Sequence, residues 1–244
     1  MTFMKDNSFR GFARLKRGIP RRRTQQLQLS DPILTALTIL LAVLLFGIAP
    51  LQSAGVLLGN YVGFFFGLVL VPAAFMVSDS KIAGGSILFA IALLAASILL
   101  DLKQLGSLDL YLDELAWLIA GLTLSIVVAR AVFAPGKVTF HRIIGAILLY
   151  LNIGVVFVGL FGLTALISTK AFSAIEPQSG DFAFADKLIY FSFVTLTTMG
   201  YGDIVPLHPY ARSLANIEAI IGQLYPATLL ARLVTLEVES KRET

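Results

Sequence analysis

Long apolar runs, interrupted by a few short polar segments, dominate the chain. No charged residue occurs between Asp31 and Asp79, and this stretch is too long for one membrane-crossing helix of about 20 residues. Polar and turn-forming residues break the stretch near its middle: Pro50, Gln52, Ser53 and Gly55. We therefore predict two spans joined by a tight hairpin, over residues 33–49 and 56–76.

Four further spans and one shorter apolar segment follow. The spans are expected near residues 82–100, 115–133, 143–168 and 211–234. Between the last two lies a short run, residues 188–198, whose helix would be only about 16 Å long at 1.5 Å per residue. Because that is about half of the hydrocarbon thickness, the run must enter the membrane and return on the same side. The pattern predicts an all-α membrane protein with six transmembrane helices, a re-entrant helix (186–198) and a loop after it.

The composition agrees with a membrane protein and argues against an enzyme. Of the 244 residues, 57% are hydrophobic and 14% are charged, whereas soluble domains carry about 25% charged residues. The chain has no cysteine, so it has no disulfide framework and no thiol chemistry. Its two histidines, His141 and His208, are expected on opposite sides of the membrane. We find no convergent set of His, Ser and carboxylate side chains that would catalyse a reaction.

The distribution of basic residues predicts the orientation in the membrane. Residues 1–23 are rich in Lys and Arg and contain a single acid, Asp6. Directly before an apolar span, such a segment favours a cytoplasmic anchor that rests on anionic lipid over a nucleic-acid-binding arm. The connection after Arg130 is also basic, whereas the connections on the other side are rich in Asp and Glu. We expect a multi-pass protein of the cell membrane with both termini in the cytoplasm and no nucleic-acid partner.

The candidate chemistry lies directly after the short apolar run, in FVTLTTMGYGDIVP, residues 193–206. Irregular backbone at membrane depth is tolerated where protein buries it or where it lines a water-filled path. Gly200 and Gly202 permit backbone angles that other residues disfavour, so successive carbonyls can point towards one axis. The carbonyl end of the preceding helix carries a partial negative charge, which favours a cation. A ring of carbonyls that replaces a hydration shell is a chemistry that selects potassium ions.

The heptapeptide TTMGYGD, residues 197–203, resembles the signature of the potassium channel superfamily, whose common form is Thr-Val-Gly-Tyr-Gly-Asp. The resemblance covers residues 143–235 and includes the preceding YFSFVTLTT, the following Pro206 and a last helix with Gly222. With its six spans, the chain is similar to a bacterial six-span channel of the voltage-gated-like superfamily. The resemblance implies five parts: a basic cytoplasmic segment (1–31), a four-helix sensor-like domain (32–134), a linker (135–142), a pore domain (143–235) and a short cytoplasmic tail (236–244).

The resemblance also implies the roles of individual residues. The filter would consist of Thr198, Met199, Gly200, Tyr201 and Gly202. Carbonyls of residues 198–201 and the Thr198 hydroxyl would coordinate K⁺, which is the only ligand expected, and Asp203 would lie at the outer mouth. Pore-helix residues would support the filter, with the first two packing against Tyr201: Tyr190, Phe191, Thr195 and Thr197.

Assembly and selectivity follow from the same filter. One chain supplies one filter strand, and a ring of carbonyls needs four, so we expect a homotetramer. Met199 stands where valine is usual and replaces a stiff side chain with a flexible thioether, which leaves the strictness of selectivity open. Two rivals to a potassium-selective channel therefore stay open: a weakly selective cation channel, and a non-conducting membrane sensor that reuses the fold.

Five residues outside the filter raise further questions. Voltage sensors need several charges in the fourth span, which here carries only Arg130, so we expect weak or absent voltage dependence. Glu218, the one acid well inside a span, would either bond the hydroxyl of Thr195 or Thr197 or line the cavity. Gly222 and Pro226 would form either a gating hinge or a close helix contact. His141 is either a pH sensor or an interfacial polar residue.

Overall fold

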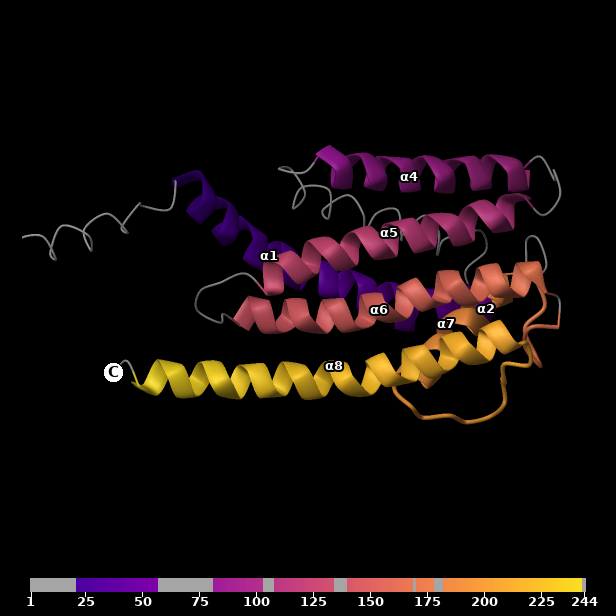
Figure 1. The fold of residues 1–244 in the computed structure, drawn as a ribbon. Helices are drawn as coiled ribbons and strands as arrows, with labels where there is room; N and C mark the ends of the chain where they lie inside the picture. The colour runs from indigo at the N-terminus through magenta and orange to yellow at the C-terminus, as the bar shows by residue number, and fades with distance from the viewer. Residues whose placement is uncertain are drawn as a thin grey trace, which may run out of the picture.

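The computed structural model describes residues 21–56, 81–102, 108–133, 140–168, 170–177 and 182–242. Within these ranges the fold is all-α, as the sequence predicts (Figure 1). The helices are α1 (Arg21–Val43), the π-helical turn η2 (Leu44–Ile48), α2 (Ala49–Ser53), α4 (Lys81–Leu102), α5 (Leu108–Val132), α6 (Phe140–Ile167), α7 (Phe182–Leu196) and α8 (Pro209–Arg242).

The first predicted span is longer than expected. The helix does not end at residue 49 but continues through η2 and α2 to Ser53, where the backbone turns at Gly55 with φ 72°. Pro50 does not stop it, because proline is tolerated in the first turn of a helical segment, where no backbone N–H is needed. The predicted second span, residues 56–76, lies almost wholly outside the described residues.

The other helices match the predicted segments with shifted ends. The predicted spans 82–100, 115–133, 143–168 and 211–234 correspond to α4, α5, α6 and α8. The largest differences are that α5 begins at Leu108 and that α8 continues to Arg242. The short apolar run forms α7, a helix of 15 residues that begins and ends slightly earlier than predicted.

Helix α6 lies at the centre of the packing. Figure 1 shows α4, α5, α6 and α8 roughly side by side in that order, and α6 also contacts α1 and α7. The α5–α6 contact is close because Gly121 has no side chain. A Cβ added there would lie 2.9 Å from the Val156 side chain. Asn152 of α6 donates from Nδ2 to the Gly121 carbonyl at 2.7 Å across the same contact. The first helices thus pack against the later half of their own chain.

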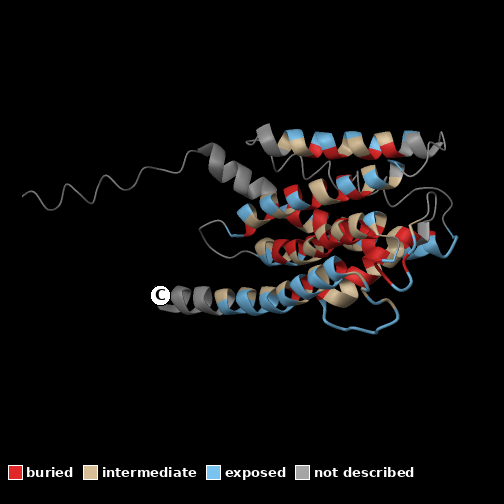
Figure 2. Ribbon diagram, turned by 45° about the vertical axis from the view of Figure 1, so that its right-hand side comes forward, coloured by how far each residue is buried: buried red, intermediate tan, exposed pale blue. Residues whose placement is uncertain are grey.

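Buried residues gather where α5, α6 and α7 meet, whereas α8 exposes much of its length (Figure 2). An aromatic cluster joins α6, α7 and the loop between them (residues 170–177, called the outer loop below) at the centre of this region. The ring centroids of Phe161 and Phe191 lie 4.9 Å apart, and those of Phe172 and Phe191 lie 5.1 Å apart. This cluster fixes the outer loop and the short helix α7 against α6.

Three helices in the described ranges are long and apolar enough to cross a membrane: Pro32–Ser53, Leu110–Val132 and Phe140–Ile167. A shorter apolar helix covers Gly84–Ser97. Helix α8 is long but carries polar residues such as Asn216, Glu218 and Gln223 within its central part. The apolar helices indicate a membrane protein, and α8 is not among the helices that are apolar enough by this measure.

Candidate functional site

Helix α7 ends directly before the glycine-rich residues. The Met199 N–H bonds the Val194 carbonyl at 2.9 Å, and the Thr198 N–H bonds the Thr195 carbonyl at 2.9 Å. This pair of bonds is the Schellman arrangement, in which the residue after the helix adopts the left-handed conformation and is usually glycine. Here that residue is Thr198, with φ 56°, the one non-glycine residue with positive φ in the described ranges. A β-branched residue is rarely held in this conformation.

Positive φ then recurs at every second residue of the TTMGYG segment (residues 197–202). Thr198, Gly200 and Gly202 have φ values of 56°, 59° and 82°. A backbone that alternates between left-handed and right-handed conformations turns successive peptide groups to the same side instead of opposite sides. The sequence provides glycine at two of the three positions, where the left-handed conformation costs least.

The outer end of the TTMGYG segment is attached to α7 through Tyr190. The rings of Tyr190 and Tyr201 are stacked, with centroids 6.4 Å apart and planes inclined by 3°. The Tyr190 hydroxyl donates to Asp203 Oδ2 at 2.8 Å, and this bond raises the pKa of the Tyr190 hydroxyl above its ordinary value. Tyr190 is thus the packing partner that the sequence predicts for Tyr201. The Phe191 ring packs against Phe161 and Phe172 in the aromatic cluster, and its packing against Tyr201 stays a prediction.

The chain after the TTMGYG segment is held by the outer loop. Phe172 and Pro206 form an isolated antiparallel bridge, and the Leu207 N–H bonds the Ala171 carbonyl at 2.7 Å. Ser173 and Val205 exchange two bonds of 3.0 Å, one of them to the Ser173 hydroxyl oxygen. These bonds fix the C-terminal end of the loop that carries Asp203.

Helix α8 contacts the inner side of α7 through a buried polar group. The Glu218 side chain has no exposed surface, and its Oε1 lies 2.6 Å from the Ser192 hydroxyl oxygen. Ser192 Oγ also lies 2.9 Å from the Gly154 carbonyl oxygen of α6. The expectation that Glu218 bonds Thr195 or Thr197 is wrong, because both threonine hydroxyls donate to carbonyls of α7. A buried bond of Glu218 exists, but its partner lies one turn earlier on α7.

Gly222 brings the backbones of α7 and α8 together. A Cβ added at Gly222 would clash with the Leu196 carbonyl oxygen. Helix α8 runs without a break through Gly222 and the exposed Pro226. The structure therefore gives Gly222 the close-packing role that the sequence left open. A hinge at Gly222 or Pro226 stays a prediction.

Two polar contacts of α8 were not predicted from the sequence. Gln223 donates from Nε2 to the Thr198 hydroxyl oxygen at 2.6 Å. Two residues closer to the C-terminus, the Tyr225 hydroxyl donates to the Ala146 carbonyl of α6 at 2.7 Å. Both are residues with polar groups inside the predicted span 211–234, and this position is the signal that would have identified them.

A cavity of about 800 Å³ lies beside the TTMGYG segment, between α7 and the end of the first span. Met199 lines it together with Phe193, whose ring packs at 5.1 Å against Phe46. The Met199 side chain is 57% exposed, so this chain alone does not pack around it. Thr197 and Tyr201 also line the cavity, which therefore reaches the back of the segment.

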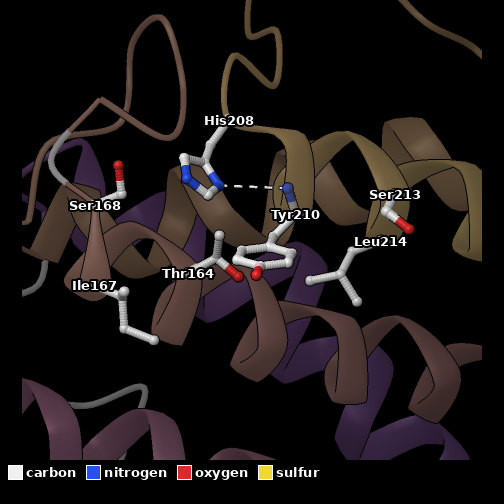
Figure 3. Close-up of a pocket in the computed structure, with 7 residues that line it drawn as sticks. All are labelled: Thr164, Ile167, Ser168, His208, Tyr210, Ser213 and Leu214. Carbon is white, nitrogen blue, oxygen red and sulfur yellow. Dashed lines mark hydrogen bonds between the residues drawn. The ribbon is translucent and has the colours of Figure 1, made fainter.

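A second cavity of about 340 Å³ lies between the end of α6 and the start of α8 (Figure 3). Its polar rim includes His208, whose Nδ1 accepts a bond of 3.3 Å from the Tyr210 backbone N–H. The Tyr210 ring lies beside His208, with centroids 5.2 Å apart. This cavity is separate from the TTMGYG segment, and its remaining lining combines three hydroxyl residues with Ile167 and Leu214.

At the opposite end of the molecule, polar contacts join other helices. His141 Nδ1 lies 2.9 Å from the Thr35 hydroxyl, which links α6 to α1. Arg232 of α8 lies over the Phe133 ring, with its guanidinium carbon 4.6 Å from the ring centroid. Arg130 itself is exposed. His141 thus contributes to helix packing, while a pH-sensing role stays a prediction.

Comparison with known proteins adds one match. Residues 138–239 match the model of a protein family described as "Ion channel". The matched segment contains α6, α7, the TTMGYG segment and nearly all of α8. No curated protein and no solved structure matches the chain. Together with the apolar helices, this match indicates a membrane protein whose residues 138–239 are similar to an ion channel.

Proposed function

We propose that the chain is a potassium-selective channel that conducts K⁺ passively through a homotetrameric pore. Residues 198–202 form the selectivity filter in this proposal, and α7 is a re-entrant pore helix. The observation that carries the proposal is the positive φ at Thr198, Gly200 and Gly202, which suits a strand whose carbonyls face one axis. Four such strands around a symmetry axis would replace the hydration shell of K⁺.

The surroundings of the filter support the same reading. The stacked rings of Tyr190 and Tyr201 and the bond to Asp203 support the filter from behind and at its outer end. The bonds from α8 to Ser192 and Thr198 support it at its inner end. A filter that is held at both ends is preorganised, so an ion does not have to order it on binding.

We further propose six membrane spans with both termini in the cytoplasm. Helix α7, with 15 residues, is too short to cross the membrane, which supports a re-entrant position. The basic connection after Arg130 supports a cytoplasmic location of that connection. Because the fourth span carries a single arginine, the channel is not strongly voltage-gated in this account.

One observation favours a second candidate, a weakly selective cation channel. Met199 exposes 57% of its side chain and lines the 800 Å³ cavity behind the filter. A filter backed by a flexible thioether is less rigid than one backed by a packed β-branched residue. The relative permeability of Na⁺ and K⁺ separates this candidate from the main proposal.

Potassium flux from liposomes tests the proposed function, with Gly200→Ala as the critical variant. A Cβ added at Gly200 or at Gly55 would meet no other atom within 4 Å, and both glycines have positive φ. Alanine therefore imposes a backbone strain of about 1–2 kcal/mol at either position without a clash. We expect barium-sensitive K⁺ flux from the wild type and from Gly55→Ala, and loss of flux in Gly200→Ala. A wild-type protein without flux would leave the non-conducting sensor as the better account.

A further inference from the structure

The contact between Gln223 and Thr198 joins the middle of α8 to the inner end of the TTMGYG segment. The Gln223 Nε2 lies 2.6 Å from the Thr198 hydroxyl oxygen, across 25 residues of sequence. Gly222, the residue before Gln223, allows this approach because any larger side chain there would meet the Leu196 carbonyl. The contact is therefore built by the close packing of two helices and does not depend on a mobile loop.

We propose that Gln223 positions the Thr198 hydroxyl for the innermost ion site of the filter and thereby sets how tightly that site binds a cation. The inference rests on the proposed function. In this inference, the side chain of Gln223 helps to determine which ions the filter prefers, although Gln223 lies outside the filter strand.

The chemistry of the hydroxyl group explains the proposed effect. A threonine hydroxyl has one proton and two lone pairs, and it rotates to suit its neighbours. When the Gln223 amide donates to one lone pair, the hydroxyl proton points elsewhere and the other lone pair is free for a cation. Without this donor, the hydroxyl samples rotations that turn its proton towards the ion. An oxygen ligand that is fixed in advance binds more tightly than one that the ion must order.

The backbone of Thr198 makes such a constraint necessary. Thr198 has φ 56°, a conformation that β-branched residues rarely adopt and that persists only where surrounding contacts enforce it. Its backbone N–H is already used in the bond to the Thr195 carbonyl. The bond from Gln223 is the contact that acts on its side chain. The Gln223 bond therefore acts on the Thr198 hydroxyl, which would be an ion ligand in addition to the Thr198 carbonyl.

Barium block from the cytoplasmic side tests the proposal in the full-length channel in planar bilayers. Barium is a divalent cation close in radius to potassium and is therefore a sensitive probe of oxygen ligands. We expect Gln223→Leu to weaken barium block about three- to tenfold, which corresponds to one lost hydrogen bond. The ratio of Rb⁺ to K⁺ permeability should change in the same variant. Gln223→Asn, whose shorter amide cannot reach, should behave in the same way.

Thr228→Val is the matched control on the same helix. The Thr228 hydroxyl is exposed and bonds only carbonyls of its own helix, at Leu224 and Tyr225, so its loss should leave block and permeability ratio unchanged. A second control combines Gln223→Leu with Thr198→Val. If Gln223 acts through the hydroxyl, Gln223→Leu should have no further effect on barium block in a Thr198→Val background.

The outcomes separate this proposal from the proposed function. Wild-type protein without a K⁺ current would overturn both. A conducting wild type with barium block unchanged within twofold in Gln223→Leu would overturn the role of Gln223 alone. If Gln223→Leu and Gln223→Asn fail to assemble while Thr228→Val assembles, the bond serves folding only, and the proposal is likewise wrong.

Discussion

The Ser192 hydroxyl oxygen lies 2.6 Å from Glu218 Oε1 and joins the buried face of α7 to the centre of α8. The same hydroxyl oxygen lies 2.9 Å from the Gly154 carbonyl of α6. One serine thus connects three helices of the segment that matches the ion channel family. The second carboxyl oxygen of Glu218 has no hydrogen-bond partner among the described residues.

Substitutions in this pair should affect stability more than conduction. Ser192→Ala leaves the buried carboxyl without its partner and should cost about 1–3 kcal/mol, measured as a lower midpoint for heat dissociation of the assembly. Glu218→Gln keeps a group that bonds Ser192 and should change the midpoint little. Conductance of Glu218→Gln at low K⁺ should equal that of the wild type. A reduced conductance would show instead that Glu218 lines the cavity and attracts cations.

Gly222→Ala should damage both assembly and flux. The added methyl group meets the Leu196 carbonyl, so α8 must move away from α7, at a cost of about 1–3 kcal/mol. Gly84→Ala is the control, because Gly84 is also a helical glycine but has open space around it. That substitution should be neutral or stabilising by up to about 1 kcal/mol. If Gly222→Ala keeps its thermal midpoint and alters only the open probability, Gly222 is a hinge and not a close contact.

Tyr190→Phe should loosen the outer end of the filter. The substitution keeps the ring that stacks on Tyr201 and removes the hydroxyl that bonds Asp203. We expect a higher permeability to Na⁺ relative to K⁺, measured from reversal potentials. Phe191→Leu, in the aromatic cluster, is the comparison and should lower stability without changing the permeability ratio. Equal ratios in wild type and Tyr190→Phe would contradict a role for this bond in selectivity.

The same bond predicts the direction of a pH effect. The pKa of the Tyr190 hydroxyl is raised because the protonated form donates to Asp203. Its contribution is therefore fully present below the ordinary pKa of tyrosine, about 10, and is lost only as the pH rises through the raised value. Selectivity should stay constant from neutral pH to about pH 9. A loss of selectivity within that range would show that Tyr190 is not the group that holds Asp203.

Voltage dependence should be weak and independent of Arg130. One charge moving through 100 mV supplies about 2.3 kcal/mol, which is too little for steep gating. Arg130 is exposed at the end of α5, where a long basic side chain can reach the membrane surface. Current–voltage curves of wild type and Arg130→Gln should therefore coincide. A marked shift of the conductance–voltage curve in Arg130→Gln would contradict this view.

The helices and the glycine-rich segment could be predicted from the sequence because both depend on local pattern. Apolar runs fix where the helices lie, and the glycines at 200 and 202 mark the left-handed positions. The end of the first span was misplaced because Pro50 was read as a helix stop, although it lies in the first turn of α2. Local pattern does not reveal that a new helical segment starts there.

The side-chain partners of the site could not be predicted, because they depend on how α7 and α8 are rotated against each other. Ser192 and Thr195 lie on α7 and Thr197 directly follows it, yet only Ser192 bonds Glu218. The role of Thr198 as a left-handed helix end was hidden as well, because glycine usually takes that position. Gln223 becomes a candidate only once Gly222 is known to contact α7.

The reversal potential of the purified full-length protein, with K⁺ on one side of a planar bilayer and Na⁺ on the other, tests the central claim most directly. The account predicts a current that reverses far towards the K⁺ equilibrium potential, with Gly55→Ala behaving as the wild type. Gly200→Ala should carry no selective current, because residue 200 must hold φ 59°. A reversal potential near zero, or a selective current that survives Gly200→Ala, would contradict the claim that the TTMGYG segment is a potassium filter.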